Sequence, residues 1–298
     1  MNMNWNINDI PIFVEIIEKM GISAAAEQLG MPKSSVSRSL SRLEEALGVR
    51  LLERNSRQLR ITSEGEAFYR HSLLIMEQVN EANAKMTGLT AVPSGKMVVT
   101  LPMAFSREIV AKHLHLFTRK YPEIELEIMI TSHPVDIIRE QIDVAVMIGP
   151  LSDSELIAKK LLSSRLLWVT SPAYKESIDL GAMPEDLVQH VEVCEKRYAK
   201  SKVIVTYLNK KRQINLSKVI RVNDPIAVRE AVVYGSGVGL VPQIYCRDQL
   251  DDGRLVEVFP EVEFELSSPI FAVYPSRRLI SNKVRAFLDF LQEITQKQ

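Results

Sequence analysis

The segment Ser23–Leu43 constrains the fold of this chain more than any other, because it places a tight turn between two helical patterns. Three consecutive alanines, Ala24 to Ala26, give the first helix a thin side that a second helix can cross closely. Gly30 can take the left-handed conformation that ends a helix, and Pro32 fixes φ for a new helical start. The segment therefore predicts a helix-turn-helix.

The second of these helices is amphipathic. Its apolar residues form one stripe, spaced by four, three and four residues: Val36, Leu40, Leu43 and Leu47. Short or basic residues occupy the other side: Lys33, Ser34, Ser37, Arg38 and Ser41. Serines let a helix lie deep in the major groove of DNA, and cations near its start can reach guanine edges or phosphates. The alternative is a solvated face on an ordinary helical hairpin.

The next segment favours DNA binding over that alternative. Residues Leu51–Thr62 alternate around a polar tip, which predicts a two-stranded wing. Between residues 31 and 60, seven basic side chains outweigh three acidic ones, so this segment carries +4 although the whole chain is neutral. A basic patch confined to one segment attracts phosphate without making the whole protein adhere to polyanions.

This region resembles the N-terminal domain of LysR-type transcriptional regulators. The matching motifs run in order through Phe13-Val14-Glu15, Ala25-Ala26, Val36-Ser37-Arg38, Leu43–Arg54 and Ile61–Gly65. The resemblance implies binding to double-stranded DNA. The family usually has Ser or Ala at the position of Pro32 and Gln-Pro at Lys33-Ser34, so the departure here bears on which bases are preferred.

The resemblance also implies roles for single side chains. Those expected to contact base edges are Lys33, Ser34 and Arg38. Those expected to contact the DNA backbone are Ser35, Ser37, Arg42 and Arg54. Arg57, at the tip of the wing, is expected to enter the minor groove.

A long helical pattern follows the wing. Thr62 can cap its start, and the chain then runs without proline from Ser63 to Val92. Apolar residues recur at steps of seven: Phe68, Ile75, Ala82 and Leu89. This stripe predicts pairing with the same helix of a second subunit, the alternative being packing on its own domain. By resemblance the chain is expected to form a dimer or a tetramer that reads a pseudo-palindromic operator.

Beyond the break at 92–95, strand and helix patterns alternate, which predicts an α/β domain with a parallel sheet. Strands are predicted at 97–101, 125–131, 143–148, 167–171, 203–207, 238–241 and 269–275. Helices are predicted at 105–121, 135–141, 225–234 and 281–295. The glycine-rich run Gly235–Gly239 follows a helix and precedes a strand, so we interpret it as a helix-ending turn rather than a phosphate loop.

Five further motifs resemble the effector-binding portion of the same family, which has two α/β subdomains like a periplasmic binding protein: Phe117–Pro122, Asp143–Val146, Thr170–Tyr174, Gly235–Pro242 and Val284–Leu288. The expected domains are a winged helix-turn-helix at 1–62, a linker helix and hinge at 63–94, and an effector-binding domain at 95–298. Subdomain I would comprise about 95–165 and 268–298, and subdomain II about 166–267.

A small-molecule effector is expected in the cleft between these subdomains, where strand ends and helix N-termini favour a small anion. The residues expected to line it are Pro102, Met103, Ala104, Phe105, Thr131, Ser132, Met147, Ile148, Asn223 and Asp224. Many relatives have hydroxyl residues after the first strand, and Met147 stands where relatives often have arginine. The sequence therefore predicts a more apolar effector or none, and structural roles explain these residues about as well.

Composition and motifs narrow the location of the protein and the classes of function that remain. No segment could span a membrane and no secretory signal is evident, so a cytoplasmic protein without a membrane partner is expected. Cys194 and Cys246 lack metal-type spacing, and neither a metal nor a cofactor is expected. An enzyme is disfavoured because no activated nucleophile or acid–base pair is evident. An oxidant-responsive regulator using Cys194 or Cys246 and a sensor without a DNA role remain alternatives, and RNA polymerase is a further candidate partner.

Overall fold

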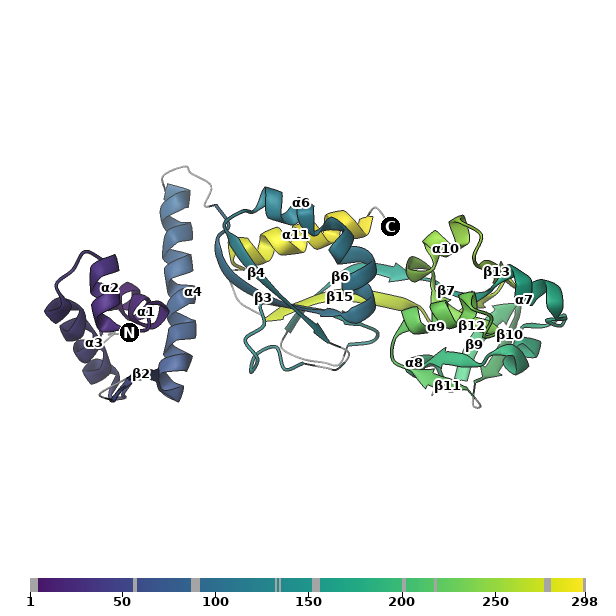
Figure 1. The fold of residues 1–298 in the computed structure, drawn as a ribbon, viewed down its shortest axis with the longest axis horizontal. Coiled ribbons are helices and arrows are strands. Elements are labelled where there is room, and N and C mark those ends of the chain that lie inside the picture. The colour runs from purple at the N-terminus through teal and green to yellow at the C-terminus, as the bar shows by residue number, and fades with distance from the viewer. Residues whose placement is uncertain are drawn as a thin grey trace. The chain divides into compact units, whose positions relative to one another are not determined.

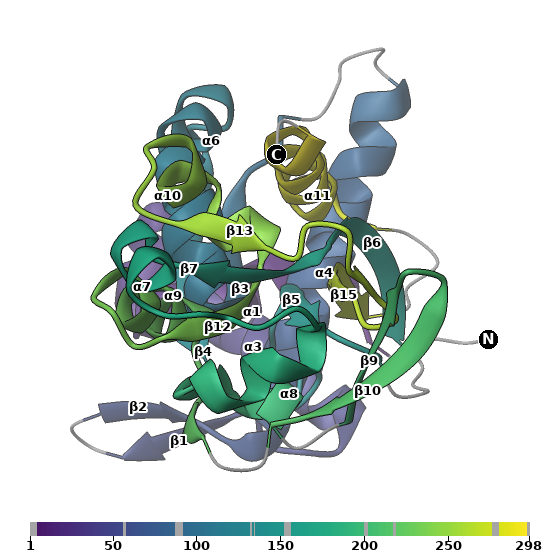
Figure 2. The ribbon, with the colours of Figure 1, turned by 90° about the vertical axis from the view of Figure 1, so that its right-hand side faces the viewer.

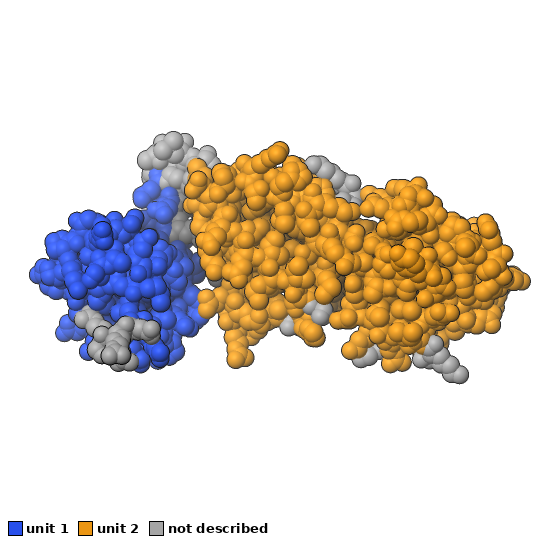
Figure 3. Space-filling model, viewed as in Figure 1, with its two compact units in different colours: residues 1–91 blue, residues 92–298 orange. Residues whose placement is uncertain are grey.

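The computed structural model describes residues 5–55, 58–86, 92–131, 133, 135–151, 156–199, 202–216, 219–275 and 280–296. The chain divides into two compact units, Met1–Ala91 and Val92–Gln298 (Figures 1 and 3). Each unit has its own hydrophobic core. None of the helices in the described part of the chain combines the length and the apolarity needed to cross a membrane.

The N-terminal unit contains the predicted helix-turn-helix and wing. Its elements are α1 (Asp9–Glu18), α2 (Ile22–Gln28), α3 (Lys33–Leu47), β1 (Leu52–Asn55), β2 (Gln58–Ile61) and α4 (Ser63–Met86). Strands β1 and β2 pair antiparallel, which confirms the wing. The core joins buried side chains of α1 and α2 to the apolar stripe predicted for α3.

The turn between α2 and α3 has the predicted backbone conformation. Gly30 has a φ of +62°, in the left-handed region that favours glycine. Pro32 directly precedes the first residue of α3 with φ −60° and ψ 136°. Ala25 and Ala26 are buried in the core that α3 completes, so the small residues allow the close crossing that was predicted.

Hydrogen bonds of Thr62 join the start of α4 to the residues of the wing and the segment before it. The hydroxyl of Thr62 accepts a hydrogen bond from the Gly65 N–H at 2.9 Å and lies 2.8 Å from the Arg50 carbonyl, to which it donates. Thr62 therefore caps the helix as predicted. Gly65 packs so closely on the preceding segment that an added Cβ would lie 2.0 Å from the Leu51 carbonyl oxygen.

The apolar stripe of α4 is only partly exposed. Phe68, its first predicted member, packs inside its own unit, with ring centroids 5.5 Å from Phe13 and 5.8 Å from Trp5. The expectation that the whole stripe faces a second subunit is wrong for Phe68, because the helix-turn-helix core already covers it. Val79, further along α4, is 45% exposed. Leu89 lies outside the described residues.

The C-terminal unit has two lobes (Figure 1). The first lobe contains β3 (Gly95–Pro102), α5 (Met103–Phe105), the π-helical turn η1 (Ser106–Val110), the 3-10 turn η2 (Ala111–His113), α6 (Leu114–Lys120), β4 (Ile124–Thr131), β5 (Val144–Ile148), β6 (Leu156–Ser164), β15 (Ser268–Pro275) and α11 (Asn282–Gln296). Its sheet has the order β4-β3-β5-β15-β6. Strands β3, β4 and β5 are parallel, as predicted, but β15 runs antiparallel to β5 and β6.

The second lobe holds the residues between β6 and β15. Its elements are β7 (Leu166–Thr170), α7 (Pro172–Ser177), η3 (Pro184–His190), β8 (Val193–Glu195), α8 (Lys196–Ala199), β9 (Lys202–Tyr207), β10 (Lys210–Asn215), β11 (Ile220–Val222), α9 (Pro225–Val233), β12 (Val238–Pro242), η4 (Gln243–Tyr245), α10 (Arg247–Asp251), β13 (Val256–Val258) and β14 (Glu263–Phe264). Here β8 and β11 pair parallel, whereas the sheets β12-β7-β13 and β10-β9-β14 are antiparallel.

Two predictions for this unit were wrong. The second lobe is mostly antiparallel: β12 and β13 return along β7, β14 returns along β9, and β9 and β10 form a hairpin. Leu208 and Asn209 both have positive φ, which suits the two-residue hairpin between β9 and β10 (Figure 2). The helix predicted at 135–141 is a series of turns. The Asp136 carboxylate accepts from the backbone N–H groups of Ile138 and Arg139, which offers this segment an alternative to a helix.

Candidate nucleic-acid interface and ligand cleft

Helix α3 presents the predicted base-reading residues to solvent. Lys33, Ser34 and Arg38 are exposed, while Ser35 and Ser37 are half-buried. Within the described residues, no side-chain hydrogen bond caps the N-terminus of α3, and the Ser35 and Val36 N–H groups donate to the Pro32 carbonyl. The exposed face thus offers two cations, hydroxyls and a helix N-terminus, which together suit a polyanion with readable edges.

Arg42 has a different placement from the other predicted DNA contacts. Its guanidinium donates to both carboxylate oxygens of Asp9, with the Nε–Oδ2 distance at 2.9 Å. Asp9 is 2% exposed, and its carboxylate raises the pKa of Arg42. The pair joins α3 to α1, so Arg42, whose side chain is 56% exposed, orients the recognition helix by binding the buried Asp9. Arg54 lies in β1, and its side chain, like the whole of Arg57, lies outside the described residues.

Glu44 is a buried carboxylate that the sequence did not single out. Its Oε1 accepts from the N–H groups of Leu51, at 2.8 Å, and Leu52, at 3.1 Å. Glu44 is 5% exposed, and Arg50 lies 3.3 Å from its other oxygen. The Glu44 carboxylate therefore holds the first residues of the wing in place against α3.

Replacing Glu44 with alanine is expected to lower the free energy of unfolding of the N-terminal unit by about 2 kcal/mol, because two buried N–H groups lose their acceptor. Hydrogen exchange at the Leu51 and Leu52 amides measures the loss. Glu45→Ala is the matched control, since Glu45 is exposed on the same helix. Equal amide protection in the two variants would contradict this role for Glu44.

The predicted effector residues of the first lobe follow the carboxyl ends of three adjacent parallel strands. Pro102 and Thr131 are register partners at the ends of β3 and β4, and Met147 and Ile148 end β5. The side chains of Ala104 and Phe105 belong to the hydrophobic core, whereas Met103 is 45% exposed. Ser132 lies outside the described residues.

The predicted residues of the second lobe lie at a second strand edge. Asn223 and Asp224 follow β11, and Asp224 accepts from the Ile226 N–H at 3.1 Å, which caps α9. Strand β8 runs parallel to β11, with Glu195 opposite Val222. The same edge therefore carries Glu195, a buried carboxylate that sequence reasoning missed and that accepts from the nearby Arg197.

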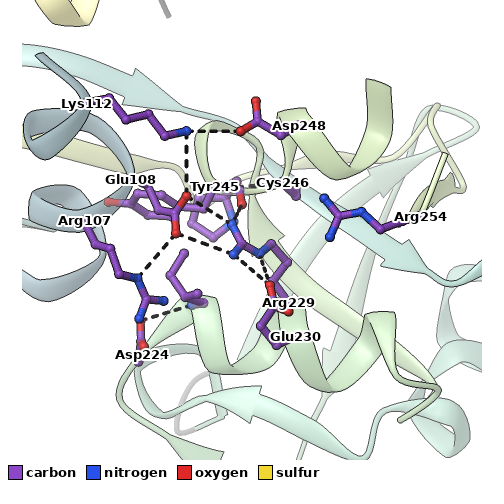
Figure 4. A network of polar contacts seen from close by, with 12 residues as sticks. Arg107, Glu108, Lys112, Asp224, Arg229, Glu230, Tyr245, Cys246, Asp248 and Arg254 are labelled. Atoms are coloured by element: carbon purple, nitrogen blue, oxygen red, sulfur yellow. Dashed lines mark hydrogen bonds and ion pairs between the residues drawn. The ribbon is translucent and has the colours of Figure 1, made fainter. Parts of the chain in front are cut away.

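An ion network joins the two lobes (Figure 4). Arg229 of α9, whose side chain is 8% exposed, lies 3.4 Å from Glu108 of η1 and 2.7 Å from Glu230. It also donates to the Tyr245 carbonyl at 2.8 Å. Nearby, Lys112 of η2 lies 3.1 Å from Asp248 of α10. A pocket of about 30 Å³ is lined by these groups and by Gln249.

Both cysteines are buried, each with essentially no exposed surface. Burial raises the pKa of Cys194 and of Cys246 to about 12, so both thiols stay protonated at neutral pH. Reactive redox cysteines need an accessible thiolate. The placement of Cys194 and Cys246 therefore opposes the alternative of an oxidant-responsive regulator.

Comparison with known proteins covers both units. Residues 7–66 match the family of bacterial regulatory helix-turn-helix proteins, lysR family, and residues 90–296 match the LysR substrate binding domain. A transcriptional regulator of Xanthomonas campestris pv. campestris is 32% identical over 97% of this chain and 85% of its own length.

Solved structures are similar over nearly the full chain. CrgA, a LysR-type transcriptional regulator from Neisseria meningitidis, gives a TM-score of 0.62 at 28% identity and covers 97% of this chain and 99% of its own. The Vibrio cholerae virulence activator AphB gives a TM-score of 0.58 at 26% identity, with 96% and 98% covered. The similarity therefore includes the order of the two units as well as each unit by itself.

Proposed function

The chain belongs to the LysR family of bacterial transcriptional regulators, and on this basis we propose which of its surfaces read DNA and which bind an effector. It is a DNA-binding transcriptional regulator with an effector-binding domain. Its relatives are named as regulators, and regulation rather than catalysis is the role proposed. A bacterial regulator meets its operator in the cytoplasm, which is the location proposed.

The observation that carries the DNA assignment is the exposed face of α3. We infer base contacts for Lys33, Ser34 and Arg38, which share that face. Backbone contacts are proposed for Ser35, Ser37 and Arg54, and a minor-groove contact for Arg57. Arg42 is proposed to act at the DNA backbone mainly by positioning α3, because its guanidinium is bound to Asp9.

Selection of bound fragments from genomic DNA tests this assignment. The full chain is expected to enrich an inverted repeat, and Arg38→Ala is expected to weaken binding to that repeat at least tenfold, since a good base contact contributes about 1–3 kcal/mol. Arg119→Ala, an exposed arginine of α6 in the other unit, is the matched control. Unchanged enrichment by Arg38→Ala would contradict the proposed reading face.

We propose that α4 pairs with its counterpart in a second subunit. The exposed apolar side chain of Val79 supports this, because it lies on the same face of α4 as Ile75 and Ala82 and a partner helix would cover it. Two recognition helices would then read the two halves of a pseudo-palindromic operator. A full chain that sediments as a monomer at micromolar concentrations would contradict pairing.

The effector site is proposed at the facing strand edges of the two lobes, with Pro102, Met103, Thr131, Met147, Ile148, Asn223 and Asp224 at its walls. Ala104 and Phe105 would shape it from the core, and Ser132 is proposed from its place after β4. An effector changes operator affinity only if it binds two conformations of the regulator unequally. A ligand that saturates this site and leaves operator affinity unchanged would contradict the coupling.

A further inference from the structure

Two ion pairs join the lobes of the C-terminal unit at a surface that we call the seam. The seam lies between η1 and η2 of the first lobe and α9, η4 and α10 of the second (Figure 4). Arg229 lies 3.4 Å from Glu108, and Lys112 lies 3.1 Å from Asp248. The chain crosses between the lobes twice, after β6 and after β14, and no described strand of one lobe pairs with a strand of the other. Away from these two crossings, side chains therefore hold the lobes together.

Glu108 has a second set of partners within its own lobe. Its carboxylate lies 3.4 Å from Arg229 across the seam, but also 3.5 Å from Arg107 and 4.0 Å from Lys112. A carboxylate with little exposed surface is costly when it is left without a compensating charge. Loss of the ion pair with Arg229 leaves Glu108 next to two cations of the first lobe, so the carboxylate keeps compensating charge.

Arg229 likewise has partners within the second lobe, and these are closer to it than Glu108 is. Its guanidinium lies 2.7 Å from Glu230 and donates to the Tyr245 carbonyl at 2.8 Å, whereas Glu108 is 3.4 Å away. The buried guanidinium therefore keeps its two shortest contacts when the pair across the seam breaks. The pair between Arg229 and Glu108 can break without leaving either charge alone, which lowers the cost of a shift between the lobes.

The second pair across the seam is exposed to water. The side chains of Lys112 and Asp248 are 51% and 65% exposed. Water solvates both charges when such a pair breaks, and an exposed ion pair contributes little free energy by itself. Each of the two cross-lobe pairs thus has a replacement for the partner that it loses, either within its lobe or in the solvent.

The other contacts of the seam do not specify one position of the lobes. Side chains of both lobes, among them Ile109 and Tyr245, belong to one apolar cluster, but apolar contact has no preferred direction. The most extensively packed pairs of elements in the described part of this unit each lie within one lobe. A pocket of about 30 Å³ lies between the lobes, and Gln249, which lines it, has a buried Oε1 without a hydrogen-bond partner among the described residues. The apolar contact therefore permits a shift that the ion pairs oppose.

We propose that the seam is a switch that sets the relative position of the two lobes. With the cross-lobe pairs formed, the lobes keep the position seen in this structure. When those pairs exchange for in-lobe partners and water, the lobes shift along the apolar contact. This inference deepens the proposed effector coupling and rests on it for its regulatory role: an effector bound between the lobes favours one of the two positions, and operator affinity follows.

The distance between two spin labels, one on each lobe, measures the shift. Labels are attached to the full chain through Thr118→Cys, at an exposed position of α6, and Glu176→Cys, at an exposed position of α7. Cys194 and Cys246 are buried, so they stay unlabelled. An excess of unlabelled chain keeps distances between subunits out of the measurement.

Removal of both cross-lobe pairs is expected to release the lobes. The double variant Glu108→Gln with Asp248→Asn keeps the size of both side chains and is expected to lower the fraction of chains at the native label distance at least twofold. Lys96→Gln is the matched control, because Lys96 pairs with Glu127 on the surface of the first lobe alone. This control is expected to leave the label distance unchanged.

Salt provides a second measurement on the native chain. Raising KCl from about 0.1 M to about 1 M shortens the screening length from about 10 Å to about 3 Å, which weakens the exposed pair of Lys112 and Asp248 first. The fraction at the native label distance is expected to fall with salt in the native chain, and to fall less in the double variant, which lacks both pairs.

An unchanged label distance in the double variant and at high salt would overturn the proposal, because the apolar contact alone would then fix the lobes. Emission of Trp168, which is buried in the core of the second lobe, checks that the variant is folded. If the double variant does not fold, Asp248→Asn alone takes its place, since Asp248 is exposed. The single variant is expected to show a smaller change in the same direction, and no change would overturn the proposal.

Operator binding separates this inference from the function on which it rests. If the double variant shows the shift but binds the operator as tightly as the native chain, the switch stands and its link to regulation fails. If the label distance does not change while the native chain still enriches an operator that Arg38→Ala loses, the switch fails and the regulator stands.

Discussion

Replacing Arg229 with alanine is expected to lower the free energy of unfolding of the C-terminal unit by about 2–3 kcal/mol. The guanidinium of Arg229 is almost fully buried, forms ion pairs with Glu108 and Glu230, and donates to the Tyr245 carbonyl. Truncation removes the donor to that carbonyl and leaves Glu108 with only Arg107, at 3.5 Å, and Lys112, at 4.0 Å. The loss is the cost of weakening these buried polar contacts, not the net contribution of one ion pair.

Trp168 fluorescence during urea denaturation measures this loss, in a Trp5→Phe background, because Trp168 is then the only tryptophan of the chain. Arg254→Ala is the matched control: Arg254 pairs with Asp252 at 2.7 Å, but both side chains are about half exposed. It is expected to change the urea midpoint little, because solvent screens an exposed ion pair. An equally small change for Arg229→Ala would show that water replaces the guanidinium.

A double variant checks the physical reason. Combining Arg229→Met with Glu108→Gln removes both charges while keeping side chains of similar length. It is expected to recover at least about half of the stability lost in Arg229→Ala, since apolar or neutral replacements of a buried ion pair are tolerated better than one missing partner. No recovery would indicate that packing of the Arg229 stem, rather than charge, is what alanine removes.

Gly65→Ala is expected to disrupt the junction between the wing and α4. The new Cβ would lie 2.0 Å from the Leu51 carbonyl oxygen and 2.8 Å from Ile61 Cγ1, closer than atoms can approach. The backbone must therefore shift, and the hydrogen bond from the Gly65 N–H to Thr62 is lost with it. A destabilisation of about 3 kcal/mol and at least tenfold weaker operator binding are expected.

Hydrogen exchange in residues 58–72, together with operator affinity, measures this effect. Gly21→Ala is the matched control in the same unit, because its added Cβ would meet nothing closer than 3.8 Å and its φ of 177° is open to any residue. It is expected to leave both readouts unchanged. Normal protection in Gly65→Ala would mean that the wing moves aside at little cost.

Sequence reasoning succeeded where the determinants are local. Gly30, Pro32 and the apolar stripe of α3 lie within one short segment, and the structure confirms the helix-turn-helix that they predict. Thr62 and the wing follow the same logic. Strands β3, β4, β5 and β15 of the first lobe were also found, because each is a short apolar run between turn residues, whereas β6 was not predicted.

Sequence reasoning failed where the interacting residues are far apart in the sequence. Tyr245 is far in sequence from Glu195 and Tyr198, and nothing in their own neighbourhoods indicates that each carries a buried oxygen without a hydrogen-bond partner among the described residues. The partners of Arg229 lie in η1, α9 and η4, so the network requires the fold to be known first. The antiparallel direction of β9 and β10 depends on the left-handed pair Leu208-Asn209, which lacks the glycine typical of such a turn. The other antiparallel pairs join strands that are far apart in sequence.

The bond between Arg42 and Asp9 has an evolutionary consequence. It assigns the positioning of the recognition helix to Arg42, whereas Lys33, Ser34 and Arg38 are exposed on the proposed reading surface, so the scaffold and the reading surface can change independently. Exchanges at Lys33, Ser34 or Arg38 alter no buried contact and can redirect the regulator to new promoters while its stability stays constant. A duplicated copy of this chain could therefore acquire a different set of target genes through few substitutions, provided that Arg42 and Asp9 persist together.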